Sequence, residues 1–153
     1  MKKEIEKLQK VSDKLFSLMG TSAKSAVTYN EKDEVFVVDV DAGDETGLLI
    51  GKRGDTLLSI QNILSVLLKQ EVGEWKKVIV NIGDYREKEE EYLNNLAKTT
   101  ADRAVETGSV QNLYNLKSWQ RRVVHMALSE DSRVETTSEG EGEDRFLIIS
   151  PKK

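Results

Sequence analysis

The stretch of sequence that decides the fold is GLLIGKRGD, residues 47–55. Gly51 and Gly54 frame a turn, and the apolar pattern after it predicts a helix. Glycine has no Cβ, so these two residues allow a tight turn that a sugar-phosphate strand can approach closely. Lys52 and Arg53 lie between them, where both side chains are expected to reach solvent. The positive end of the following helix points the same way, so the loop predicts a binding site for a polyanionic strand.

Apolar residues directly before the turn add a second element to this site. Leu48, Leu49 and Ile50 are expected to border a groove in which bases lie, with Ile50 next to Gly51. Contacts to base edges, rather than to phosphates, would then supply sequence preference.

Apolar periodicity predicts the elements around the loop. The expected order is a helix over 2–19, strands over 26–30 and 35–41, a short helix over 44–50, a helix over 55–69 and a strand over 78–82. The first two strands form a hairpin. Two helices separate the second strand from the third, so a parallel crossover is the economical topology. The unit is therefore α-β-β-α-α-β around a three-stranded mixed sheet.

The second half predicts a smaller α+β unit. A long helix runs from Asp84 to Gly108, followed by a strand over 110–114, a helix over 116–129, and strands over 133–137 and 145–149. We place the domain boundary at the start of the long helix, giving domains 1–83 and 84–153. Without proline or low-complexity sequence between 70 and 110, this helix is expected to join the halves rigidly.

Composition limits the possible functions. The chain has 153 residues, 38% of them hydrophobic, which suits a globular α+β protein. Its net charge of −4 argues against coating nucleic acid by bulk electrostatics, so binding has to be local. With no cysteine and one histidine, neither a metal site nor a cofactor is expected. No apolar run suits a membrane span or a signal sequence, and we expect a cytoplasmic protein.

A nucleotide-binding P-loop is a competing interpretation of Gly47 and Gly51-Lys52. That motif needs four residues between its glycines and a serine or threonine after its lysine. Only three residues separate Gly47 from Gly51, and Arg53 stands where the magnesium-binding hydroxyl is required. The spacing therefore does not favour a nucleotide hydrolase.

A polar stripe is predicted in the second half. Lys117, Arg121 and His125 are four residues apart in a helical segment, so one helix face is expected to carry all three. A guanidinium can bind phosphate with two hydrogen bonds, and an imidazole can bind phosphate or stack on a base. A lone histidine is more often structural, and that interpretation stays open. No nucleophile motif accompanies His125, so a hydrolase is not favoured and no catalytic residue is assigned.

These motifs resemble two known modules. Residues 14–83 are similar to a type II KH domain, whose hallmark is the G-x-x-G loop seen at Gly51–Gly54. The spacing Arg121-x-x-x-His125 and its flanks, residues 121–128 and 134–140, are similar to the bacterial R-three-H (RxxxH) domain. Together, residues 14–150 resemble the bacterial Jag family (SpoIIIJ-associated, KhpB type).

The family resemblance implies binding of single-stranded RNA or DNA, about four nucleotides at the KH domain, and partnership with a small single-domain KH protein. Family members usually carry a Jag domain and a basic linker ahead of the KH domain. Neither is in these residues, so a role at the membrane or cell envelope is not expected. A proline expected before the helix over 116–129 is also missing, and Asn115 is expected to cap that helix instead.

The prediction is a non-enzymatic, single-stranded RNA-binding regulator with two contact surfaces. The expected binding residues are Ile50, Gly51, Lys52, Arg53, Gly54, Lys117, Arg121 and His125. The alternative is a protein-interaction adaptor that uses the KH fold to dimerise and has weak RNA binding or none. Salt dependence separates the two, because phosphate contacts make affinity fall with salt.

Overall fold

The computed structural model describes residues 1–153, which form two compact units, Met1–Arg86 and Glu87–Lys153. The sequence placed the boundary between residues 83 and 84. The first two residues of the long helix stay with the first unit, because the Arg86 side chain donates hydrogen bonds to the main-chain oxygen of Val80.

The first unit has the predicted order of elements. They are α1 (Lys2–Leu18), β1 (Lys24–Asn30), β2 (Val35–Asp41), α2 (Thr46–Ile50), α3 (Asp55–Val72) and β3 (Val78–Ile82). The sheet order is β1-β2-β3: Val38 of β2 pairs antiparallel with Val27 of β1 and parallel with Val80 of β3. Both the mixed sheet and the crossover are confirmed.

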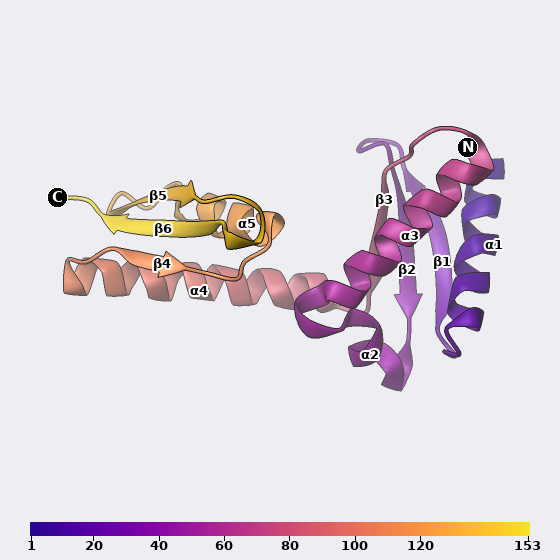
Figure 1. Ribbon diagram of the computed structural model, residues 1–153, viewed down its shortest axis with the longest axis horizontal. Helices are drawn as coiled ribbons and strands as arrows, with labels where there is room; N and C mark the ends of the chain where they lie inside the picture. Colours follow the sequence, from indigo (N-terminus) through magenta and orange to yellow (C-terminus); the bar gives the residue numbers. More distant parts are fainter. The chain divides into compact units, whose positions relative to one another are not determined.

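One face of this sheet is buried under two helices. In Figure 1, α3 crosses β2 and β3, and α1 lies beside β1. The core contains Leu8, Phe16, Phe36, Val38, Val40, Leu57, Ile60, Leu64, Leu68, Val78, Val80 and Ile82. The alternate residues of β2 and β3 lie on the other face, as strand geometry requires. Helix α3 continues past the predicted end at Lys69 to Val72, and Gly73 stops it with a left-handed φ of 86°.

The second unit packs a three-stranded antiparallel sheet against helices. Its elements are α4 (Tyr85–Thr107, which begins in the first unit), β4 (Gln111–Leu113), α5 (Ser118–Leu128), β5 (Val134–Glu139) and β6 (Phe146–Pro151), with sheet order β4-β6-β5. The core contains Leu93, Ala97, Ala101, Ala104, Val124, Leu128, Val134, Leu147 and Ile149. The α+β class is confirmed for the whole chain. None of the helices combines the length and apolar character needed to span a bilayer.

Candidate nucleic-acid interface

The turn between α2 and α3 has an unusual backbone. Gly51 has φ 72° and ψ −169°, and Gly54 has φ 80° and ψ 13°. Arg53 also has a positive φ, at 51°. The Gly51 conformation is open only to glycine, and the other two lie in the left-handed region. These angles let the chain leave α2 and start α3 within four residues.

The need for glycine comes from the protein's own packing. A Cβ on Gly51 would lie 2.2 Å from Thr56 Oγ1, and a Cβ on Gly54 would lie 2.9 Å from Tyr85 Oη. Gly54 is buried. Both missing side chains would therefore meet the protein's own atoms, which is a reason for glycine in addition to the expected approach of a strand.

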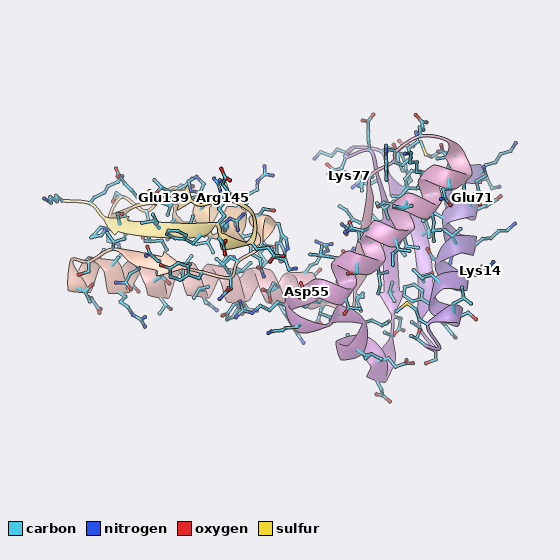
Figure 2. The ribbon with its side chains drawn as sticks, viewed as in Figure 1. Lys14, Asp55, Glu71, Lys77, Glu139 and Arg145 are labelled. Atoms are coloured by element: carbon cyan, nitrogen blue, oxygen red, sulfur yellow. The ribbon has the colours of Figure 1, made fainter.

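The charged side chains of the turn do reach solvent. Lys52 and Arg53 are both exposed. Helix α3 starts at Asp55 without a side-chain cap on its N-terminal amides. Figure 2 marks Asp55 at this end of α3. Two exposed cations and the positive end of a helix therefore lie together at the turn, and both attract phosphate.

The apolar residues before the turn divide between core and surface. Leu49 is 1% exposed and Leu48 is 71% exposed. Ile50, which the sequence placed at the groove, is half-buried and packs against the core of the first unit. Leu48 is thus the side chain of this segment that offers most apolar surface to a ligand.

A carboxylate fixes the segment that leads into α2. Glu45 accepts hydrogen bonds from the Ser22 main-chain N–H at 2.9 Å and from Ser22 Oγ at 2.7 Å. These bonds hold the pKa of Glu45 below its usual value. The Thr46 hydroxyl donates to the Gly43 carbonyl at 2.7 Å. The approach to the turn is therefore tied to the start of β1.

A polar contact that the sequence did not reveal lies between α3 and the edge of β3. Gln61 Oε1 accepts a hydrogen bond from the Val80 N–H and another from Arg86 Nη2, each at 3.1 Å. Arg86 also donates to the Val80 carbonyl, from Nη2 at 3.1 Å and from Nε at 3.3 Å. The edge strand is thereby bonded to side chains at Val80. No motif marks Gln61, because its partners are 19 and 25 residues away.

Arg121 is anchored within the second unit. Its Nη1 donates to the carbonyls of Leu116 at 2.5 Å and of Arg145 at 3.3 Å. Nε and Nη2 make no hydrogen bond within the protein. One nitrogen therefore holds the half-buried side chain in place, while the other two remain for an external acceptor.

His125 is exposed one helical turn further along α5. Its Nδ1 is hydrogen-bonded with Thr136 Oγ1 on β5. With Nδ1 bonded to threonine, Nε2 is the ring nitrogen that can bond an external partner. Arg121 and His125 thus share the predicted face of the helix.

Lys117 stands at the position just before α5 begins, and its carbonyl accepts a hydrogen bond from the Arg121 N–H at 2.9 Å. It is the N-cap of α5, with extended backbone angles of φ −70° and ψ 161°, so the four-residue helical spacing does not place its side chain. Its N–H donates to Gln120 Oε1 at 2.8 Å, and the buried Gln120 donates to Glu89 Oε1 at 2.9 Å. Asn115 has a φ of 60° and precedes the cap by two residues, so Lys117 and not Asn115 occupies the N-cap position.

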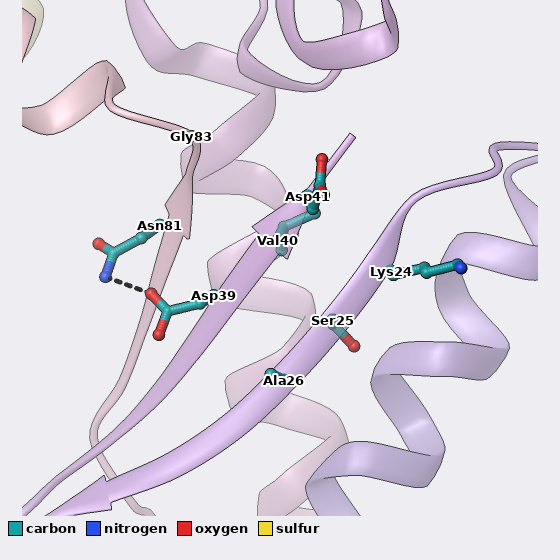
Figure 3. A pocket seen from close by; sticks show the side chains of 8 residues that line it. All are labelled: Lys24, Ser25, Ala26, Asp39, Val40, Asp41, Asn81 and Gly83. Carbon is teal, nitrogen blue, oxygen red and sulfur yellow. Dashed lines mark hydrogen bonds between the residues drawn. The ribbon is translucent and has the colours of Figure 1, made fainter. Parts of the chain in front are cut away.

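A hollow of about 420 Å³ lies on the sheet face that α1 and α3 leave open. Asp39, Asp41 and Lys24 supply its charged side chains, and Asn81 Nδ2 donates to Asp39 Oδ1 at 3.0 Å (Figure 3). Two carboxylates against one ammonium give this surface the wrong sign for a phosphate strand. It is therefore not part of the candidate interface.

Comparisons with known proteins agree with this division of the chain. Residues 8–82 match the family model "KhpA/KhpB, KH domain", and residues 91–151 match the family model of the R-three-H domain. The chain is similar to three proteins named RNA-binding protein KhpB. It is 36% identical over 151 residues to the one from Clostridium symbiosum, covering 99% of this chain and 66% of the relative. It is 35% identical over 134 residues to that of Bacillus subtilis strain 168 (86% and 64%). It is 32% identical over 107 residues to that of Lactiplantibacillus plantarum (70% and 33%).

The chain spans about two thirds of the length of the first two relatives and one third of the third. The matched regions contain the G-x-x-G turn at residues 51–54 and the RxxxH pair at Arg121 and His125. With a KH domain of this type followed by an R-three-H domain, the chain belongs to the KhpB (Jag) family.

Proposed function

We propose that this chain binds single-stranded RNA, holding the sugar-phosphate backbone at the turn Gly51–Gly54. The observation that carries the proposal is the pair of exposed cations, Lys52 and Arg53, at the uncapped N-terminus of α3. Phosphates meet two positive side chains and the positive end of the helix dipole there. A KH loop of this kind holds about four nucleotides.

The RxxxH face of α5 is proposed as the second contact. Arg121 donates to phosphate from Nε and Nη2 while Nη1 stays bonded to the Leu116 and Arg145 carbonyls. His125 adds a hydrogen bond from Nε2. Two modest sites on one chain raise each other's effective concentration, so together they hold a longer strand better than either alone.

The relatives' name supports RNA binding over an adaptor without RNA binding, since each is called an RNA-binding protein. The proposal assigns no catalytic step to the chain and places it in the cytoplasm. The matched KH model covers two kinds of KH protein, which supports a partner with a KH domain of its own. Light scattering of the chain alone and mixed with a small single-domain KH protein distinguishes monomer, homodimer and heterodimer.

Charge reversal at the turn tests the proposal. Lys52→Asp with Arg53→Asp is expected to remove nearly all affinity for a labelled single-stranded RNA pool, because phosphates would then meet two carboxylates in place of two cations. The fold is expected to survive, since both side chains are exposed and aspartate tolerates the left-handed angles of residue 53.

The matched control is Lys10→Asp with Lys14→Asp, which makes the same change in net charge on the exposed side of α1. Figure 2 shows Lys14 pointing outward there. The control is expected to bind nearly as well as the unaltered protein. Unchanged affinity in the turn variant, or equal losses in both variants, contradicts the proposed site. Running the same titration with DNA of matching sequence shows whether the chain prefers RNA.

A further inference from the structure

The side-chain amide of Gln61 has an orientation that its contacts determine. Its Oε1 lies 3.1 Å from both the Val80 N–H and Arg86 Nη2. Both partners are donors, and a guanidinium has no acceptor, so the atom between them has to be the amide oxygen. The Nε2 group therefore points away from Val80 and Arg86.

That Nε2 group is a donor without an internal acceptor. It makes no hydrogen bond within the protein and is not fully buried, so it keeps contact with solvent. Two bonds to the same oxygen restrain the amide before any ligand arrives. Little side-chain entropy remains to be lost on binding, which makes such a donor a good recognition element.

Gln61 also has the right position. It lies six residues after Asp55 on α3, about 9 Å along the helix axis from the turn at 1.5 Å per residue. It faces the edge of β3, which has no further strand beside it in the order β1-β2-β3. The main-chain groups of Val80 that an edge strand would otherwise offer to a ligand are bonded to Gln61 and Arg86. The amide thus replaces the strand edge as the polar group presented there.

We propose that Gln61 is a base-reading residue of this KH domain, donating from Nε2 to an acceptor on a base: a carbonyl oxygen or an unprotonated ring nitrogen. The inference rests on the proposed function, because the base is carried by a strand whose phosphates are held at Lys52 and Arg53. In this division of roles the turn positions the strand, and Gln61 contributes to the choice of base.

The substitution Gln61→Glu isolates the proposed contact. A carboxylate still accepts hydrogen bonds from Val80 and Arg86, so the melting temperature should hold or rise. The outward group changes from a donor to an acceptor that faces the base acceptor. Affinity for oligo(U) RNA is expected to fall by about tenfold or more, because two acceptors cannot pair.

An abasic strand separates base reading from simple charge repulsion. The test strand is a ribose-phosphate oligomer of the same length without bases. On this strand, Gln61→Glu should lose no more affinity, relative to the unaltered protein, than the control Gln70→Glu loses. Gln70 is exposed, nine residues further along α3 and therefore on the opposite face of the helix.

If the loss of affinity is as large on the abasic strand as on oligo(U), the effect of Gln61→Glu is electrostatic and the inference is wrong. Equal affinity of Gln61→Glu and the unaltered protein for oligo(U) also overturns it. Failure of the proposed function looks different: the variant with Lys52→Asp and Arg53→Asp would then bind both strands as the unaltered protein does. That variant is instead expected to lose both strands.

Discussion

Neutralising the turn between α2 and α3 should flatten the salt dependence of RNA binding by a calculable amount. Each phosphate neutralised on a single strand contributes roughly 0.7 to the slope of log affinity against log salt. Lys52→Ala with Arg53→Ala removes two such contacts, so the slope should become shallower by about 1.4. Between about 50 and 200 mM salt, a fourfold change, the unaltered protein should lose about sevenfold more affinity than the variant.

Fluorescence anisotropy with a labelled single-stranded RNA, repeated across the salt series, measures both slopes. Lys10→Ala with Lys14→Ala is the control, since it removes equal charge from the exposed face of α1. Its slope should match that of the unaltered protein. A turn variant with weaker binding but an unchanged slope would refute the reasoning, because the two cations would then act on the fold and not on phosphate.

Three further outcomes follow from the contacts of the site. Gly51→Ala should lower the free energy of unfolding by about 1–3 kcal/mol from backbone strain alone, and the overlap of the new Cβ with Thr56 should lower it further. The control is Gly47→Ala on α2, where no atom lies near the added Cβ, and it should be neutral or stabilising. Equal losses of stability in the denaturant melts of both variants would contradict this. Arg121→Ala should cost about 1–2 kcal/mol of stability, because its hydrogen bonds to the Leu116 and Arg145 carbonyls are lost. His125→Ala should weaken RNA binding with little change in the melting temperature. A large fall in melting temperature for His125→Ala, with none for Arg121→Ala, would make His125 the structural member of the pair. Ser22 lowers the pKa of Glu45, so their contact contributes fully to stability above the carboxylate's ordinary pKa of 4.5 and is lost as pH falls through the lowered pKa. The stability difference between the unaltered protein and Glu45→Gln should therefore shrink below that pH. A stability difference that stays constant from about pH 7 to about pH 3 would exclude the contact.

Local patterns were enough to predict the elements of the fold. The alternation at Phe36, Val38 and Val40 identified β2, and apolar residues at helical spacing identified α3. Glycine at 73 set the end of α3 three residues beyond the predicted one, because the last turn is half-solvated and carries little apolar signal. Burial of one face of each element therefore produces an apolar periodicity that can be recognised in the sequence.

The parts of the site that depend on contacts between distant residues were not predictable. Gln61 meets Val80 and Arg86 only after α3 has packed beside β3, and a glutamine on a helix has no pattern that marks such a role. Tyr85 explains why Gly54 must lack a side chain, although 31 positions separate the two. Lys117 is the N-cap of α5 and not one of its helical residues, because spacing alone does not show where a helix begins.

An NMR titration of the ¹⁵N-labelled chain with single-stranded RNA tests the central claim most directly. The largest amide shifts are expected at Gly51, Lys52, Arg53 and Gly54 and in the first turn of α3, saturating together with the anisotropy signal. If the amide signals of these residues do not change, and the largest changes lie instead on the open sheet face around Asp39 and Asn81, the account is contradicted.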